Sequence, residues 1–539
     1  MPPLVSQLIR ESDAFQRNRD AHLDLIARFR RLEDKVRETS GRSAAKFHKR
    51  GQLLPRERLD LLLDRDAPFL ELSTLAGLGC HEDDGEENVL GGGNIIGIGM
   101  VSGSRVMVIA SDSGIKGGAN HPWGVEKQIR AQEIALENKL PLINLVESAG
   151  ANLSLAPEMF VRGGASFANL ARLSAAGLPV ISVVHGSSTA GGAYQTGLAD
   201  YVVLVRGRSK VFLAGPPLLK AATGEIADDE SLGGSALHYE TTGVGEYLAE
   251  NDADAIRIGR EIVAKLRWDQ DEVGRAARAW SPPRYEAEEI LGLVTVDYRK
   301  PYEVRELIAR LVDDSDWLDF KPAYGPHTVC GHAAIEGRAV GIIANNGPID
   351  ASGATKAAQF VQLCCQSRTP ILFLQNTTGF MVGVDAERSA IVKHGSKMIQ
   401  AVTNADVPKI TIQIGGSFGA GHYGMCGRGF APRFLFAWPN NRVSVMGGEQ
   451  AAKVLSIVAE EGARARGIEP DKPKIDASGR AVMELYERTS SALYATARIW
   501  DDGLIDPRDT RQVVSICLAT AAEGDRRRPR RNSFGIARF

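Results

Sequence analysis

Two stretches of this chain repeat one pattern of prolines and glycines. The interval from Pro141 to Pro179 equals the interval from Pro370 to Pro408, so both landmarks recur at one constant offset along the chain. In each stretch the later proline opens an apolar run that ends in a glycine-rich segment, "GSSTAGGAYQTG" (186–197) or "GGSFGAGHYGMCG" (415–427). Two equally spaced landmarks with similar turns predict an internal duplication.

Short apolar runs alternate with amphipathic segments in both halves, which indicates β–α–β units and an α/β fold. Strands are expected at 105–112, 140–148, 178–186, 339–346, 369–379 and 406–416. Helices are expected at 14–40, 51–69, 124–139, 167–177, 352–368 and 390–405. The segment "WSPPRYEAEEILGLV" (280–294) interrupts the helical pattern with two prolines. We therefore predict two domains, residues 1–284 and 285–539.

A length of 539 residues is too great for one hydrophobic core, which agrees with two domains. The formal charge of -2 gives no reason to expect nucleic acid or a membrane surface as partner. The basic segment 525–539 is therefore interpreted as a solvated terminus or subunit contact rather than a nucleic-acid tail. The start of the chain lacks an apolar signal segment, and no run reaches the ~18 apolar residues of a membrane span. Six cysteines without a C-x-x-C pair suggest reduced thiols and no zinc, so we predict a cytoplasmic protein without a metal.

A glycine-rich turn between a strand and a helix exposes backbone N–H groups, which favours phosphate binding or oxyanion stabilisation. The phosphate version would need G-x-x-x-x-G-K-[ST], and that string is absent from the sequence. The glycines of 91–99 do not follow G-x-G-x-x-G and are interpreted as structural. Two oxyanion holes in one chain would suit a reaction with two carbonyl-bearing partners.

Side chains for conventional catalysis are scarce near the two turns. Ser187 and Ser188 belong to no G-x-S-x-G elbow, and no His–Asp pair is readable beside them. His422 is either an acid/base or a packed, hydrogen-bonded residue, and Cys426 is expected to be buried. The sequence therefore favours a mechanism in which the backbone supplies the electrostatics and a substrate or cofactor supplies the base.

Long strings elsewhere match one known family in order, and they cover nearly the whole chain. They include "GQLLPRERLDLLLD" (51–64), "FLAGPPLLKAATGE" (212–225), "LFLQNTTGFMVG" (372–383) and "WDDGLIDPRDTR" (500–511). The chain resembles the carboxyltransferase (β) subunit of a biotin-dependent acyl-CoA carboxylase, and within that family the 3-methylcrotonyl-CoA and geranyl-CoA branch. The resemblance implies two tandem crotonase-like (ββα-spiral) domains, the first on the acyl-CoA side and the second on the biotin side.

The resemblance also implies partners. An α subunit would carry both the biotin carboxylase and the biotin, and this chain would move the carboxyl group from biotin to an acyl-CoA through a thioester dienolate. The biotin itself would remove the substrate proton, which accounts for the missing side-chain base. In this family each site forms between two copies of the chain, usually within a β hexamer.

The site residues that the resemblance implies fall into three sets. The turns would supply the oxyanion donors, Gly191 and Gly192 for the thioester and Gly419, Ala420 and Gly421 for biotin. The acyl-CoA would contact Ser148, Ala149, Gly150, Ala168, Ala190, Thr223, Gly224, Asn345 and Asn346. The biotin would contact Thr378, Gly379, Phe380 and His422.

Two positions depart from the family pattern. His422 stands where methylcrotonyl enzymes usually have Asn, so the resemblance assigns it no role. Ala168 stands where they tend to carry an aromatic residue, and it either admits a longer acyl chain or packs on its helix. The alternatives are a propionyl- or acetyl-CoA type of β subunit, the carboxyltransferase subunit of a biotin-dependent decarboxylase, and an inactive paralogue. A crotonase-type hydratase would need carboxylates near the turns, and the sequence shows none there.

Overall fold

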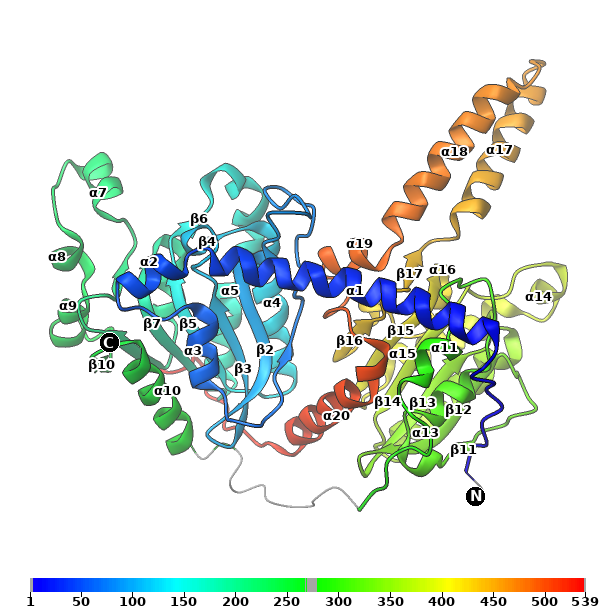
Figure 1. The fold of residues 1–539 in the computed structure, drawn as a ribbon, viewed down its shortest axis with the longest axis horizontal. Helices are drawn as coiled ribbons and strands as arrows, with labels where there is room; N and C mark the ends of the chain where they lie inside the picture. Colours follow the sequence, from blue (N-terminus) through cyan, green and yellow to red (C-terminus); the bar gives the residue numbers. More distant parts are fainter. Residues whose placement is uncertain (1–2, 267, 269–278, 538–539) are drawn as a thin grey trace. The chain divides into compact units, whose positions relative to one another are not determined.

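In the computed structural model, which describes residues 3–266, 268 and 279–537, the chain forms two compact units. The first unit consists of Arg30–Ala276, Ala497–Ile499 and Thr520–Phe539. The second unit consists of Met1–Phe29, Ala277–Thr496 and Trp500–Ala519. Each unit contains its own large sheet (Figure 1), so the expected α/β class with two tandem domains is confirmed. The domain boundary between 284 and 285 remains a prediction.

The first unit contains an eight-stranded sheet in the order β1-β2-β3-β5-β7-β8-β10, with β9 added beside β7. β1–β2–β3 are antiparallel, and the strands from β3 to β10 run parallel. The strands are β1 (Leu70–Glu71), β2 (Asn94–Val101), β3 (Ser104–Ser111), β5 (Leu142–Ser148), β7 (Val180–Thr189), β8 (Tyr201–Val205), β9 (Lys210–Phe212) and β10 (Tyr247–Ala249).

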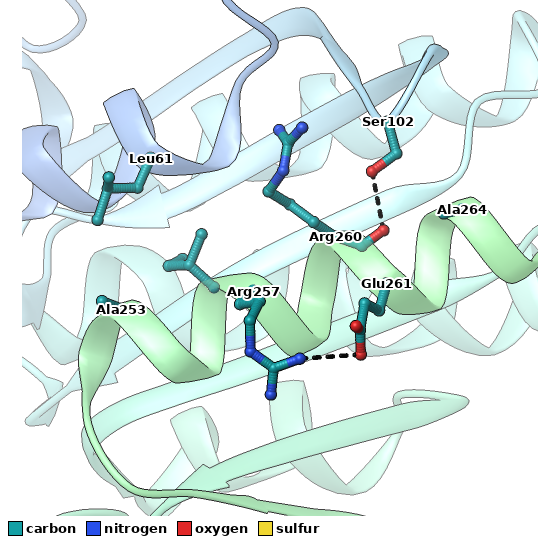
Figure 2. A pocket seen from close by; sticks show the side chains of 8 residues that line it. Leu61, Ser102, Ala253, Arg257, Arg260, Glu261 and Ala264 are labelled. Carbon is teal, nitrogen blue, oxygen red and sulfur yellow. Dashed lines mark hydrogen bonds and ion pairs between the residues drawn. The ribbon is translucent and has the colours of Figure 1, made fainter.

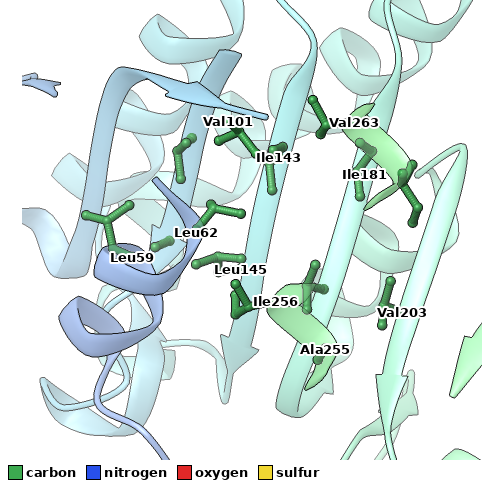
Figure 3. Close-up of a cluster of buried hydrophobic side chains, with 14 of the residues drawn as sticks. Leu59, Leu62, Val101, Ile143, Leu145, Ile181, Val203, Ala255, Ile256 and Val263 are labelled. Carbon is green, nitrogen blue, oxygen red and sulfur yellow. The ribbon is translucent and has the colours of Figure 1, made fainter. Parts of the chain in front are cut away.

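Two helices bury one face of this sheet. Leu59 and Leu62 of α3 (Pro55–Leu62) and Ile256 and Val263 of α10 (Asp252–Leu266) join the apolar side chains of the strands in one cluster (Figure 3). α4 (Pro122–Glu137) and α5 (Ala156–Ala175) also pack on the sheet, against β2, β3 and β7. The helix expected at 51–69 is wrong at both ends: it begins at Pro55, and the extended backbone of Leu63 ends it well before Pro68.

The second unit repeats this plan with seven strands in the order β11-β12-β13-β14-β15-β16 and with β17 beside β15. The strands are β11 (Leu318–Asp319), β12 (Thr328–Ile335), β13 (Arg338–Asn345), β14 (Ile371–Thr377), β15 (Lys409–Phe418), β16 (Phe434–Ala437) and β17 (Arg442–Ser444). One face is covered by α13 (Ala351–Gln366) and α15 (Ile391–Asn404). Other helices of the unit include α17 (Gly448–Ala465) and α18 (Lys472–Thr489), which form a hairpin.

The register of the strands confirms the duplication in detail. β5 and β7 recur as β14 and β15, with the same lengths and at the same offset as the prolines that precede them. The pairing of β5 with β7 shifts between Val146 and Ser148, where two steps along β5 match four along β7. The pairing of β14 with β15 shifts at the equivalent place, between Gln375 and Thr377. The β2–β3 pair recurs at a slightly larger offset, because the connection from β3 to α4 is longer than that from β13 to α13.

Other features of the described residues bear on the sequence expectations. Residues Asp13–Gly41 form the long helix α1. The six cysteines, all within the described part of the chain, form no disulfide, and Cys426 is buried. The glycines of 91–93 lie in a short 3-10 turn that leads into β2, as a structural role requires. None of the helices in the described part of the chain has both the length and the apolar surface that crossing a bilayer requires.

Candidate functional site

The first glycine turn connects β7 to a short helix. β7 ends at Thr189, a 3-10 turn covers Ala190–Gly192, and α6 (Ala193–Gly197) follows directly. Ala190 has a left-handed backbone with φ of 51°, which reverses the chain at this point. Ala190 and Gly191 are exposed, whereas Gly192 is buried. The turn therefore presents its first two residues to solvent and packs its third against the protein.

The second glycine turn has the same geometry at the equivalent place in the second unit. β15 ends at Phe418 and passes straight into α16 (Gly419–Gly424). Gly419 has φ of 53°, Ala420 is exposed and Gly421 is buried, so each position matches its counterpart in the first turn. The conformation is therefore a property of the repeated fold rather than of one sequence.

The neighbouring strand completes each site. A Cβ atom on Gly192 would lie 3.1 Å from Oγ of Ser148, and one on Gly150 would lie 3.5 Å from the carbonyl oxygen of Thr189. The first turn thus lies directly beside the end of β5. Ala149, between the two contact residues, is exposed, and its N–H donates to the carbonyl oxygen of Gly118.

The same contacts recur at the second turn. A Cβ atom on Gly421 would lie 2.8 Å from Cα of Gly379 and 3.0 Å from Cγ2 of Thr377. Thr378, the counterpart of Ala149, is exposed, and the Gly379 N–H donates to the Thr377 hydroxyl at 3.2 Å, as Gly150 N–H does to Ser148. Phe380 lies deeper, with its ring against Gly395 and Gly424. Each unit therefore brings together the predicted residues of its own turn and strand end.

Both turns can stabilise negative charge. The first N–H groups of a helix have no acceptor within the helix, and the helix dipole adds partial positive charge there. Because the turns carry glycine or alanine at their exposed positions, the turn residues themselves have no long side chain that could cover these N–H groups. Such donors act on an oxygen atom placed ~2.7–3.1 Å away.

His422 is held behind the second turn. Its Nδ1 lies 2.7 Å from Oγ of Ser417, and the Ser417 hydroxyl lies 2.8 Å from Oε1 of Gln375. Burial lowers the pKa of His422 to about 4, so the ring is neutral near pH 7. The hydrogen-bonded interpretation of His422 is therefore favoured over that of an acid/base.

Aromatic rings beside the turns are residues that the sequence reasoning missed. Phe167 of α5 reaches the first turn, since a Cβ atom on Gly191 would lie 3.3 Å from its Cζ, and its ring lies 5.4 Å from that of Tyr194. At the second turn the ring of Phe418 lies 4.8 Å from that of Tyr298. The tyrosine that follows each turn, at 194 and 423, was the one repeated signal that pointed to such residues. Ala168, the predicted acyl-pocket residue, is the half-buried neighbour of Phe167 on α5.

Four predicted acyl-CoA residues lie on other elements. Thr223 and Gly224 end the exposed helix α7 (Pro216–Thr223), where Gly224 adopts the left-handed cap. Asn345 is buried at the end of β13, and its side-chain oxygen accepts from the N–H of Asn376 at 3.5 Å. Asn346 is engaged with Glu303 and with the N–H of Val304. The structure does not show these four residues in contact with either turn.

Two expectations about side chains near the first turn are wrong. A buried His–Asp pair does exist: His185, the residue before the turn sequence, places Nδ1 3.1 Å from Oδ1 of Asp252. A carboxylate is also present, because a Cβ atom on Gly186 would lie 2.8 Å from Oε1 of Glu147. Asp252 and Glu147 are both remote in sequence from the residues they contact, so no local pattern revealed them.

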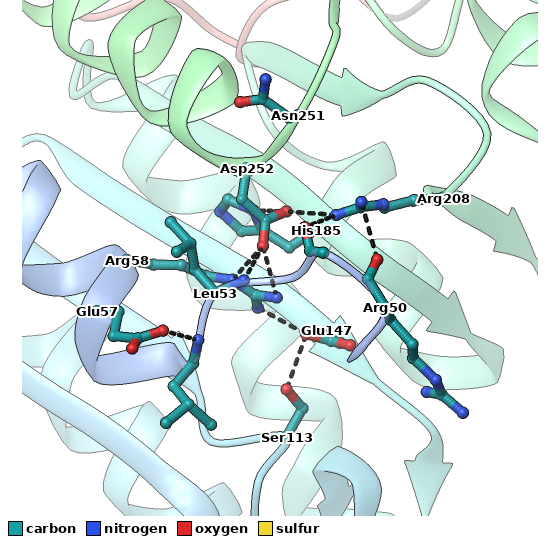
Figure 4. A network of polar contacts seen from close by, with 12 residues as sticks. Arg50, Leu53, Glu57, Arg58, Ser113, Glu147, His185, Arg208, Asn251 and Asp252 are labelled. Carbon is teal, nitrogen blue, oxygen red and sulfur yellow. Dashed lines mark hydrogen bonds and ion pairs between the residues drawn. The ribbon is translucent and has the colours of Figure 1, made fainter. Parts of the chain in front are cut away.

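Glu147, His185 and Asp252 are already engaged in hydrogen bonds and ion pairs with buried neighbours. Arg58 donates to Oε2 of Glu147 at 2.6 Å and to Oδ2 of Asp252 at 3.1 Å (Figure 4). Burial raises the pKa of Asp252, but the hydrogen bond from His185 and the charge of Arg58 outweigh it and bring the pKa to about 2. Burial lowers the pKa of His185. Ser188 is not a partner of the His–Asp pair, since its hydroxyl donates to the carbonyl oxygen of Gly192.

A separate pocket of about 380 Å³ lies along α10 and contains no residue of either turn (Figure 2). Its arginines are paired with neighbouring acids, Arg257 with Glu261 at 3.0 Å and Arg260 with Asp64 at 2.8 Å. We therefore assign it no role in a reaction. In the described part of the chain no three His, Cys, Asp or Glu residues are grouped as metal ligands.

Two equivalent α/β units, each with a glycine turn that opens a helix beside a strand end, define a tandem crotonase-like protein. Residues 46–534 match the family described as "Carboxyl transferase domain", so the chain belongs to the carboxyl transferase family. The chain is 55% identical to the β subunit of P. aeruginosa geranyl-CoA carboxylase, whose crystal structure superposes with a TM-score of 0.93 over 100% of both chains.

Curated relatives agree with this assignment. The chain is 50% identical over 496 residues to a probable biotin-dependent acyl-coenzyme A carboxylase beta2 subunit of Mycobacterium tuberculosis, a match that covers 92% of both chains. It is 45% identical over 537 residues to a probable mitochondrial methylcrotonoyl-CoA carboxylase beta chain of Drosophila melanogaster, covering 96% of this chain and 92% of the relative.

Proposed function

We propose that this chain transfers a carboxyl group from biotin on a partner subunit to an acyl-CoA with a β-methyl, α,β-unsaturated acyl group. The observation that carries the proposal is the pair of equivalent turns, at 190–192 and 419–421, in a chain of the carboxyl transferase family. A transfer between a ureido carbonyl and a thioester carbonyl needs one oxyanion site for each, and the duplication supplies two.

On the acyl-CoA side, Gly191 and Gly192 bind the thioester oxygen through their N–H groups. Stabilisation there grows as the oxygen gains charge, so it lowers the barrier for loss of the proton that makes the dienolate. No side chain of the first turn acts as the base. The carboxylate of Glu147, which lies beside Gly186, is held by Arg58 and Ser113.

On the biotin side, the donor set of the second turn suits a ureido oxygen. Gly419, Ala420 and Gly421 offer N–H groups, and Thr378 and Gly379 form the facing strand end, while neutral His422 adds no competing charge. When bound, carboxybiotin supplies the carboxyl group and the base for the substrate proton. Phe380, packed against Gly395 and Gly424, supports the turn from behind.

The acyl group is proposed to be geranyl-like rather than acetyl- or propionyl-like. The relative with 55% identity is named a geranyl-CoA carboxylase subunit. Ala168 on α5, next to the turn-contacting Phe167, leaves more room than an aromatic residue would. Ala168→Phe is therefore expected to lower kcat/KM for geranyl-CoA more than for 3-methylcrotonyl-CoA, and equal losses would argue that Ala168 only packs on its helix.

The partners are proposed by the same likeness. A biotin carboxylase and carrier α subunit would deliver the carboxyl group, and copies of this chain would form the hexameric core. The hairpin of α17 and α18 supports association, because it exposes Val454, Leu455, Ile457, Val458, Met483 and Leu485. We place the protein in the cytoplasm, in keeping with six cysteines that form no disulfide in the described chain. Sedimentation of the purified chain tests for the hexamer.

The test of function is ATP-dependent bicarbonate fixation by the chain with its biotinylated partner subunit. The acyl acceptors are geranyl-, 3-methylcrotonyl-, propionyl- and acetyl-CoA, and we expect turnover of the first two to exceed the others. Preference for propionyl- or acetyl-CoA would favour the alternative β-subunit type. ATP-independent decarboxylation of a carboxylated acyl-CoA, without fixation, would favour the decarboxylase. No turnover in either direction would indicate an inactive paralogue.

The mechanism is tested by Gly192→Val. Because the added side chain would meet Ser148, the turn must move, and losing one oxyanion donor lowers kcat by about 10²–10³-fold. Gly197→Ala is the matched control, since no atom lies within 4 Å of its added Cβ. Full activity of Gly192→Val would show that the oxyanion site lies elsewhere.

A further inference from the structure

The first unit contains a buried polar cluster that the second unit does not repeat at the positions equivalent to Glu147 and His185. We call Arg58, Ser113, Glu147, His185 and Asp252 the Arg58 cluster. Arg58 and Asp252 are each 1% exposed and His185 is fully buried. Besides the contacts of Arg58 described above, Ser113 donates to Glu147 at 2.8 Å and the N–H of Leu53 donates to Asp252 at 2.8 Å. Segments far apart in sequence therefore meet at one point (Figure 4).

The cluster lies directly under the shifted part of β7. The shift falls between Val184 and Ser188, and His185 belongs to it. Glu147 occupies the space beside Gly186, so any side chain there would collide with its carboxylate. Ser148, the next residue after Glu147, is the one that contacts Gly192. The cluster is thus linked to the turn through both strands.

The geometry of the cluster indicates which ring nitrogen of His185 donates a hydrogen bond. A carboxylate only accepts hydrogen bonds, so His185 must donate from Nδ1 to Asp252. Its Nε2 has no hydrogen-bond partner among the described residues. Arg58 faces two carboxylates, and Arg208 lies 3.9 Å from Asp252 at the edge of the cluster.

In the second unit, uncharged residues hold the equivalent shifted strand. At the equivalent positions of the repeat, Asn376 replaces Glu147 and Ile414 replaces His185. There the Oδ1 atom of Asn376 accepts directly from the N–H of Gly416 at 3.1 Å, which holds the shifted strand by one neutral hydrogen bond. The charged cluster is therefore not a general requirement of the fold.

We propose that the Arg58 cluster is a positioning device for the acyl-CoA side: it fixes the register shift of β7 and so aims the N–H groups of Gly191 and Gly192 at the thioester oxygen. This proposal rests on the function proposed above. Removing one partner of a buried ion pair is strongly destabilising, because it leaves the other charge buried and unpaired. Such a cluster therefore favours a single geometry. The cluster acts through the backbone and touches no reacting atom.

The test uses Glu147→Gln and Asp252→Asn in the holoenzyme. Since a displacement of about 1 Å at a reacting group costs about 100-fold, we expect kcat for acyl-CoA carboxylation to fall by about 10- to 100-fold with little change in KM. Acyl-CoA-independent turnover of carboxybiotin, which needs only the second turn, should stay at the wild-type rate. Ser113→Ala removes one hydrogen bond and should cost only a few-fold.

The matched control is Glu71→Gln. Glu71 lies on β1, and its carboxylate is 2.9 Å from the guanidinium of Arg56. Arg56 lies on α3, the helix that also carries Arg58, but its ion pair is made with β1 and not beside β7. The substitution should lower the melting temperature without changing kcat. Wild-type kcat in folded Glu147→Gln and Asp252→Asn would overturn the proposal, and so would an equal loss in Glu71→Gln.

Amide hydrogen exchange of segment 186–192 separates this proposal from the proposed function. Exchange should be faster in Glu147→Gln than in wild type, and unchanged in Glu71→Gln. If the wild-type holoenzyme carboxylates no acyl-CoA but this exchange pattern appears, the function has failed and the positioning role has not. Unchanged exchange in Glu147→Gln would overturn the positioning role whatever the activity.

Discussion

Ala190 and Gly419 adopt the same left-handed backbone, although only one of them is glycine. The glycines of 415–421 therefore serve different needs. Gly415 leaves room for the side chain of Asn376, Gly419 bends the chain, and Gly421 packs on the backbone of Gly379. Sequence alone showed that glycines gather here and that the segment repeats. It could not assign these separate needs, because each depends on an atom contributed by another part of the chain.

Two alanine substitutions separate these needs. Gly419→Ala should cost about 1 kcal/mol of unfolding free energy, the usual strain of a left-handed alanine, as Ala190 already bears. Gly421→Ala should cost more and should disturb the turn, because its Cβ would lie 2.8 Å from the Cα of Gly379. Urea denaturation of both variants checks the order, and a greater loss in Gly419→Ala would contradict it.

Asp501 gives the second unit a pH dependence of its own. Burial raises its pKa to about 7, although a hydrogen bond with Thr496 and the charge of Arg428 oppose this. The folded state therefore keeps a proton that the unfolded chain loses near pH 4, so this contribution to stability falls as pH rises from about 4 to about 7. Asp501→Asn removes the penalty, and its melting temperature relative to wild type should rise between about pH 4 and about pH 7. A difference in melting temperature between Asp501→Asn and wild type that stayed constant with pH would contradict the raised pKa of Asp501.

At the scale of elements, the order of strands and helices in both halves was predictable, because apolar periodicity and proline positions are local signals. The shift between β5 and β7 was not. At the shift the side chain of Glu147 fills the space beside Gly186, and such cross-strand packing leaves no mark on either strand alone. The helix expected at 51–69 failed for a related reason: its apolar residues continue past Leu62, but the backbone turns there to begin the path to β1.

A buried lysine occupies equivalent positions on α4 and α13. Lys127 donates to the carbonyl oxygens of Gly91 and Asn94, at 3.1 and 2.6 Å, and Lys356 donates to that of Lys321 at 3.2 Å. Each lysine thereby connects its helix by hydrogen bonds to a segment that leads into a strand of the sheet. Burial lowers the pKa of Lys127 to about 8.

Lys127→Met should therefore have a pH-dependent effect. Below about pH 8 the folded state holds a buried charge, and above it the folded state releases the proton before the unfolded chain does. Wild type should gain unfolding free energy relative to the variant as pH rises from about 8 to about 10. Chemical denaturation at several pH values measures the unfolding free energy of wild type minus that of the variant. If this value fell as pH rose from about 8 to about 10, the lowered pKa of Lys127 would be contradicted.

At the scale of the whole molecule, the first unit includes the end of the chain. Arg527 is 3% exposed and donates to the carbonyl oxygens of Asn138 and Lys139 at 3.3 Å. Beyond it, Asn532 donates its N–H to the carbonyl oxygen of Ala175, and Ile536 donates to the hydroxyl of Ser174. The basic tail, expected to be solvated or to contact a subunit, is packed on its own unit over these residues.

Removal of the tail should therefore weaken the first unit. A chain ending at Asp525 loses the Arg527 side chain from a buried position and leaves the carbonyl groups of Asn138 and Lys139 without these donors. We expect a lower melting temperature for the first unit, whereas a chain ending at Ile536 should melt like wild type. Equal melting of both truncations would show that the tail contributes nothing to stability.

The position of that tail also sets when the protein can finish folding. The bond between Asn138 and Arg527 closes 389 residues of chain, and that between Ser174 and Ile536 closes 362. On the ribosome, the sheet of the first unit emerges long before its last contacts exist. An incomplete surface around Asn138 and Ser174 must therefore wait, for tens of seconds at about 5–20 residues per second, until the whole second unit has been synthesised. We therefore expect translation speed and chaperone access over that interval to affect the yield of native protein.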